Sequence, residues 1–181
     1  MTSADRESIC AYLERTKAEL LETTATLNES QWSFRPAPEA WNAAECVEHL
    51  AITEAMLLGT IRKTPAAAAE TLAQCAGKEQ ILKQKVPARG KKAQAPERVR
   101  PSGVSPADAV QQFIATRDRT IEFARTTEEP IRERVFPHFV FGPLDGYQWL
   151  VFCCAHTERH LAQLKEATAA EAQSRTTGSA L

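Results

Sequence analysis

The sequence has no long apolar run and almost no net charge. Its longest strongly apolar stretch, WLVFCCA at residues 149–155, is far shorter than the roughly 18 residues that a membrane-spanning helix needs. The charged N-terminal residues lack the apolar core and the small-residue cleavage site of a secretory signal. With 22 basic and 23 acidic residues, the formal net charge is −1, so no overall positive field attracts nucleic acid or an anionic membrane. We therefore expect a cytoplasmic protein that binds neither nucleic acid nor membrane.

Paired cysteine motifs are also lacking. The chain has five cysteines, an odd number, without a C-x-x-C arrangement: Cys10, Cys46, Cys75, Cys153 and Cys154. This pattern fits reduced thiols in a cytosol better than a disulfide framework. We interpret all five as small apolar side chains.

Apolar residues recur at helical spacing in four long segments. These segments are predicted to be helices at residues 5–28, 43–61, 106–127 and 147–170. A chain of 181 residues with 43% hydrophobic content is long enough to bury the core of one domain. Sustained strand-like alternation is missing. The sequence therefore predicts an all-α four-helix bundle over residues 1–170.

The remaining segments are predicted to be connections. Residues 32–41, with two prolines and two tryptophans, read as a loop, and residues 135–146 as an ordered turn with a short extended piece. A long connection at residues 62–105 separates the second and third long helices, with short helices expected within 66–84. Its basic part, residues 88–103, is interpreted as a solvated surface loop. Residues 171–181 are expected to form a frayed polar tail.

Histidines provide the sequence pattern that most directly indicates a site. His156 and His160 are four residues apart, so a helix would project both rings from one face, where two imidazoles can chelate one divalent cation. His49 falls on, or at the edge of, the inward stripe of the second long helix. The residues alone leave open whether these histidines bind a metal or are ordinary helix residues.

Two stretches resemble the signatures of the DinB-like superfamily, bacterial helical bundles related to the bacillithiol and mycothiol S-transferases. The first is RPAPEAWNAAECVEHLAITE at residues 35–54, and the second is HFVFGPLDGYQWLVFCCAHTERHLAQL at residues 138–164. The resemblance implies a four-helix bundle in which His49, His156 and His160 bind a divalent metal ion such as zinc, nickel or iron. It does not assign a ligand role to His138.

The resemblance also implies an enzyme, either a thiol S-transferase or a hydrolase, that acts on a small-molecule thiol or another small substrate. Three protein ligands would leave coordination positions for water or a thiolate, which is typical of catalytic sites. One alternative is a non-catalytic metal-binding or stress-associated bundle, and another is a metal-free interaction module. The amphipathic parts of the first and last helices leave a homodimer open.

Four neighbours of the histidines have open roles. Glu45 is predicted to cap its helix together with Asn42, and the alternative is that it orients the ring of His49. Cys153 is a candidate fourth ligand because it lies three residues before His156. Glu158 is expected to face solvent, about 200° around the helix from His156. Trp41 is a candidate for lining a substrate pocket.

Overall fold

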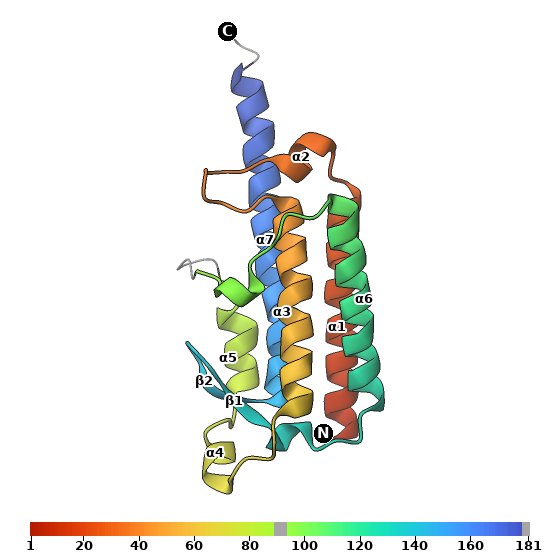
Figure 1. Cartoon of the computed structure of the whole chain (residues 1–181), viewed down its shortest axis with the longest axis vertical. Helices are drawn as coiled ribbons and strands as arrows, with labels where there is room; N and C mark the ends of the chain where they lie inside the picture. Colours follow the sequence, from red (N-terminus) through yellow and green to blue (C-terminus); the bar gives the residue numbers. More distant parts are fainter. Residues whose placement is uncertain (89–93, 179–181) are drawn as a thin grey trace.

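Four long helices run side by side in the computed structural model, which describes residues 1–88 and 94–178 (Figure 1). They are α1 (Ser3–Ala25), α3 (Ala43–Lys63), α6 (Pro106–Thr126) and α7 (Gly146–Gly178). Helix α6 packs against both α1 and α3, and α7 packs against the same two helices from the other side. The predicted four-helix bundle is confirmed.

Local capping explains where the long helices begin. Asn42 accepts a hydrogen bond from the backbone amide of Glu45, and the Glu45 carboxylate accepts one from the amide of Asn42, as the sequence predicts. Ser105 caps α6 by accepting a hydrogen bond from the amide of Asp108 with its hydroxyl oxygen, and Pro106 lies in the first turn. The predicted starts of α3 and α6 are therefore confirmed.

The first connection contains an unpredicted short helix. Helix α1 ends at Ala25 rather than near Asn28, because Asn28 caps α2 (Glu29–Ser33) by accepting from the amide of Gln31. Trp32, expected in a loop, belongs to this helix.

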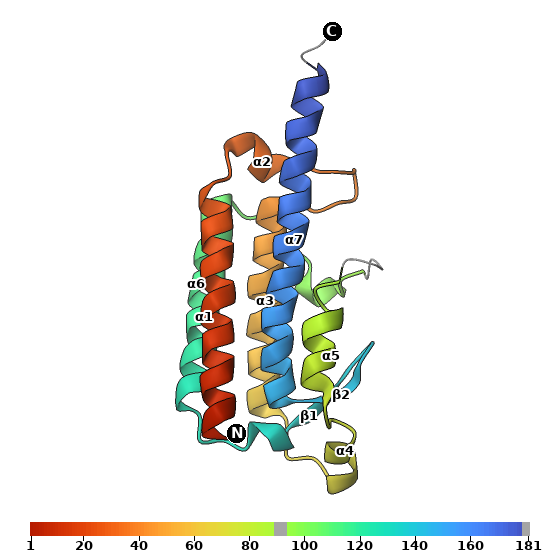
Figure 2. The same ribbon diagram turned by 180° about the vertical axis from the view of Figure 1, so that it is seen from behind.

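The connection after α3 crosses one side of the bundle. It contains the short helices α4 (Ala69–Ala73) and α5 (Lys78–Lys85), followed by the 3-10 turn η1 (Glu97–Val99). Helix α5 packs on α7, on the side away from α1 (Figure 2). Part of the predicted basic loop, residues 89–93, lies outside the described residues. The remainder is not simply a solvated loop, because Val99 is buried.

A small hairpin precedes the last helix. A second 3-10 turn, η2 (Ile131–Glu133), leads into β1 (Val135–His138), which pairs antiparallel with β2 (Gly142–Asp145). The short extended piece predicted here is confirmed. Gly146 then starts α7 close to η2, where an added Cβ would lie 2.5 Å from the carbonyl oxygen of Ile131.

Helix α7 is longer than predicted and projects beyond the other helices (Figure 1). It continues to Gly178, so the predicted frayed tail from residue 171 is wrong up to that point. Glu171 is buried and accepts a hydrogen bond from the hydroxyl of Ser30 in α2, which ties the extension to the bundle. Among the described residues, no helix is both long and apolar enough to cross a bilayer.

The core is mainly apolar, but it also contains buried polar residues, among them Arg117 at its centre. The largest fully buried apolar side chains include Ile9, Leu13, Ile61, Phe113 and Leu150. No disulfide joins the five cysteines, which all lie among the described residues, and four of them are buried, as expected for small apolar side chains.

Candidate metal centre

The three predicted histidines meet between two long helices. His49 comes from α3, whereas His156 and His160 come from successive turns of α7. One ligand atom from each histidine lies within 4.8 Å of the others. The Nε2 atoms of His156 and His160 are 3.1 Å apart, so both point into the same small space. The structure therefore brings together the three histidines that the family resemblance implies as a set.

A backbone carbonyl fixes the ring of His49. Its Nδ1 lies 2.7 Å from the carbonyl oxygen of Val99 and 3.4 Å from the hydroxyl oxygen of Thr53. Because a carbonyl can only accept, Nδ1 carries the proton and Nε2 keeps its lone pair. This hydrogen bond selects the tautomer that presents Nε2 to the other two histidines.

Glu45 does not orient the ring of His49. Its carboxylate accepts from the Asn42 amide and pairs with the guanidinium of Arg35 at 2.6 Å. The capping role predicted for Glu45 is confirmed, and the orienting acceptor is the Val99 carbonyl. Sequence reasoning missed Val99, because it lies fifty residues from His49 in a stretch interpreted as a solvated basic loop.

A carboxylate next to His49 holds the segment that contains Val99. Glu48 is 2% exposed, and its two oxygens accept from the Ser102 amide and hydroxyl and from the amides of Gly103 and Val104. Burial alone would raise the pKa of Glu48, but these hydrogen bonds outweigh it and lower the pKa. The Ser-Gly pair was the available sequence signal, since such pairs form turns that expose backbone amides.

Aromatic rings border the cluster. Trp41 lies 4.7 Å from the ring of His49 and 6.4 Å from that of His160, between ring centroids. Phe152 stacks on the ring of His156, with 5.3 Å between ring centroids and an interplanar angle of 17°. His49 and His160 are buried, whereas His156 is partly exposed. Trp41 thus lies beside the histidines, and its role in lining a substrate pocket stays a prediction.

The environment favours neutral imidazoles. Burial lowers the pKa of His49 and outweighs the opposing effect of its bond to Val99. Burial also lowers the pKa of His156 well below the usual value, and the nearby charges of His160 and His49 add to the effect. A neutral imidazole has a free nitrogen lone pair, which is the form that binds a divalent cation. The donor set therefore fits a divalent metal ion.

Two residues near the histidines have other roles. Cys153 is buried outside the histidine set, and burial raises the pKa of its thiol well above the usual value, which does not favour a thiolate ligand. Glu158 was expected to face solvent, but it is partly buried and accepts from the hydroxyl of Tyr12 and the guanidinium of Arg15.

His138 also lies outside the cluster. Its Nδ1 accepts from the backbone amides of Val140 and Phe141, which shapes the tip of the hairpin. Its ring contacts Phe152, the residue that stacks on His156. Desolvation by burial lowers the pKa of His138 to about 4.

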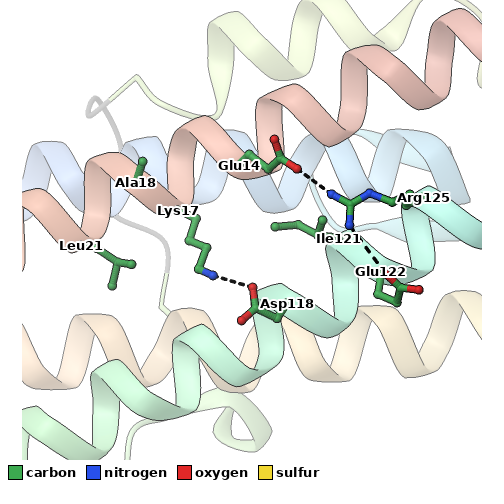
Figure 3. A pocket seen from close by; sticks show the side chains of 8 residues that line it. All are labelled: Glu14, Lys17, Ala18, Leu21, Asp118, Ile121, Glu122 and Arg125. Carbon is green, nitrogen blue, oxygen red and sulfur yellow. Dashed lines mark hydrogen bonds and ion pairs between the residues drawn. The ribbon is translucent and has the colours of Figure 1, made fainter.

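A second surface feature lies elsewhere on the bundle. A shallow groove runs between α1 and α6, where Lys17 pairs with Asp118 at 2.5 Å and Arg125 pairs with Glu14 at 2.8 Å (Figure 3). Leu21 and Ile121 also line this groove. The charged residues that line the groove form ion pairs with one another. The lining does not include the clustered histidines.

Comparison with known proteins identifies the family. The sequence profile of the DinB superfamily matches residues 12–164. The chain belongs to the DinB superfamily. The uncharacterised protein YuaE of Bacillus subtilis is 25% identical over 146 residues, which covers 77% of this chain and 85% of YuaE. The structure of YfiT from Bacillus subtilis aligns with a TM-score of 0.57 at 16% identity, over 98% of this chain and 90% of YfiT. YfiT is described as a probable metal-dependent hydrolase with an unusual four-helix bundle topology.

Proposed function

We propose that this DinB superfamily member is a metal-dependent enzyme whose centre consists of His49, His156 and His160. The observation that carries the proposal is the convergence of three imidazoles from two helices within 4.8 Å. A set of three protein nitrogen ligands is typical of catalytic sites, which keep at least one position for water or substrate. The description of YfiT as a probable metal-dependent hydrolase supports the same chemistry.

Each surrounding residue has a distinct part in this proposal. The Val99 carbonyl holds the Nδ1 proton of His49 and thereby directs Nε2 inward. Trp41 and Phe152 restrict the rotation of the rings that they contact and exclude water from two sides. The partly exposed His156 marks the side from which a small substrate would enter.

A divalent cation bound here would lower the pKa of a coordinated water or thiol and so supply a nucleophile at neutral pH. With water the reaction is a hydrolysis, and with a low-molecular-weight thiol it is an S-transfer to an electrophile. We propose that the substrate is a small molecule and that the metal is zinc, nickel or iron. The buried thiols of Cys153 and Cys154 do not serve as the nucleophile in this proposal, because burial raises the pKa of both.

The test is metal content, measured by elemental analysis of protein purified without a metal-binding tag. Near-stoichiometric metal is expected in the wild type, with loss in both His49→Ala and His156→Ala. The matched control is His138→Asn, which alters a histidine outside the cluster and should retain the metal. Metal-loaded protein is then assayed for ester hydrolysis and for thiol transfer to a chloronitrobenzene. Wild-type protein that stays metal-free after reconstitution with zinc, nickel and iron would overturn the proposal.

A further inference from the structure

The buried carboxylate of Glu48 has no direct contact with the histidine cluster, yet it belongs to the same structural unit. It accepts four hydrogen bonds from three consecutive residues, Ser102 to Val104, at 2.6–3.3 Å. All three residues donate a backbone amide, and Ser102 adds its hydroxyl, where the chain turns at Gly103, whose φ is +86°. A carboxylate that gathers several amides in this way holds the backbone in one position.

The segment held by Glu48 also contains the acceptor for His49. Val99 lies three residues before Ser102, is 3% exposed, and places its carbonyl oxygen 2.7 Å from Nδ1 of His49. Glu48 and His49 are adjacent in α3, so one turn of this helix contacts the segment at both ends. The side chain of Glu48 anchors the backbone, and the backbone in turn orients the ring of His49.

We infer that Glu48 is a positioning residue for the histidine centre: by clamping residues 99–104 onto α3, it keeps the Val99 carbonyl on His49 and fixes the Nδ1-protonated tautomer of that ring. The inference rests on the proposed function for its effect on metal affinity. Its structural part, the control of the His49 ring, concerns the protein without metal and can be measured separately.

Glu48 is the practical point at which to test this arrangement. The acceptor on Val99 is a backbone carbonyl, which no side-chain substitution removes. Glu48→Ala deletes all four anchoring bonds, Glu48→Gln keeps one carbonyl oxygen as an acceptor, and Ser102→Ala removes only the hydroxyl contact. The three variants should therefore form a graded series, with Glu48→Ala the most affected.

Two measurements distinguish positioning from general stability. Long-range ¹H–¹⁵N NMR correlations report which nitrogen of the His49 ring carries the proton, and His49→Ala assigns the signals. Competition with a chromogenic chelator gives the affinity for zinc alone. Outer partners of metal-binding histidines change metal affinity by roughly 10–100-fold, so we expect a loss of this size in Glu48→Ala and a smaller loss in Glu48→Gln.

The matched control is Glu45→Ala. Glu45 lies on the same helix, one turn before His49, and takes part in the N-terminal cap of α3. The side chain of Glu45 contacts Asn42 and Arg35. This variant should lower the melting temperature while leaving the His49 tautomer and zinc affinity unchanged. If Glu48→Ala is poorly folded, Glu48→Gln and Ser102→Ala take its place in both measurements.

The outcomes separate this inference from the proposed function. A mixed or inverted His49 tautomer and weaker zinc binding in the Glu48 variants would support the inference. A wild-type tautomer together with zinc affinity within twofold of wild type would overturn it. Wild-type protein that binds no zinc would count against the metal centre, and the tautomer comparison would still decide whether Glu48 orients the ring.

Discussion

Arg117 and Glu54 form an ion pair at the centre of the bundle, where Arg117 is fully buried. Nε of Arg117 lies 2.9 Å from Oε1 of Glu54, and Nη2 lies 2.7 Å from Oε2. The same guanidinium donates to the Leu13 carbonyl and to the hydroxyls of Thr16 and Thr157. One side chain of α6 thus binds groups from α1, α3 and α7, which fixes how the four helices align. Buried ion pairs can favour one arrangement of a fold over others. In this bundle, the contacts of Arg117 with three other helices are the physical basis for that effect.

Removing one member of this pair should cost much more than removing both. Arg117→Met leaves the Glu54 carboxylate buried without its cation, for which we expect a loss of about 3–5 kcal/mol in the free energy of unfolding. The double variant Arg117→Met with Glu54→Leu should recover a large part of that loss, because no unpaired charge remains. Urea unfolding of the wild type, Arg117→Met, Glu54→Leu and the double variant gives the coupling energy between the two residues. Additive effects of the two substitutions would contradict this account of the pair.

Local signals in the sequence predict much of this fold. The starts of α3 and α6 follow from capping residues adjacent to them, and the i, i+4 spacing of His156 and His160 places both on one helix face. The length of α7 could not be predicted in this way. Its extension is supported by the contact of Glu171 with Ser30, which only the folded chain brings together.

Contacts between distant parts of the chain also limited the prediction of the candidate metal centre. The periodicity of α3 places His49 near the inward stripe, but only the family resemblance paired it with the two histidines of α7. Val99 and Glu48 were missed because their contacts join α3 to a segment about fifty residues later. That segment is basic and rich in proline, a composition that favours a solvated loop when only local properties are considered. Tertiary hydrogen bonds determined its structure instead.

Metal binding should quench the fluorescence of one particular tryptophan. Trp41 lies 4.7 Å from His49 and 6.4 Å from His160, so a paramagnetic ion such as Ni²⁺ held by these rings would be close to its indole. We expect Ni²⁺ to reduce the tryptophan emission of the wild type and to have much less effect on Trp41→Phe. Trp32→Phe is the control, because Trp32 lies on α2. Equal quenching in both variants would place the bound ion elsewhere.

His138 should make stability fall as the pH drops from about 6.5 to about 4. Burial lowers its pKa from 6.5 to about 4, so the unfolded chain takes up a proton in this window and the folded chain does not. Above pH 6.5, His138 does not lower the free energy of unfolding. Below pH 6.5, its titration lowers that free energy by at most about 1.4 kcal/mol for each pH unit. His138→Asn keeps an acceptor for the amides of Val140 and Phe141 but does not titrate, so its loss of stability over this range should be smaller. Parallel urea-unfolding curves at pH 7, 5.5 and 4 provide the comparison, and identical pH dependence in the two proteins would refute the assignment.

Asp5 should affect the stability of the fold in a pH range below that of His138. Arg132 donates to both oxygens of Asp5, at 2.9 and 3.1 Å, and holds the pKa of that carboxyl at about 2 against the opposing effect of burial. Because the folded pKa lies below the ordinary value of 3.8, the stabilisation is complete above about pH 4 and is lost as the pH falls towards 2. The pair is partly exposed, so its contribution should be about 1 kcal/mol. Asp5→Asn keeps an acceptor for the Thr2 amide and removes the charge. The difference in unfolding free energy between wild type and Asp5→Asn should therefore stay constant from pH 7 to 5 and shrink towards zero by pH 2. A difference that stayed constant from pH 7 down to pH 2 would show that Asp5 titrates normally and that Arg132 does not hold its charge.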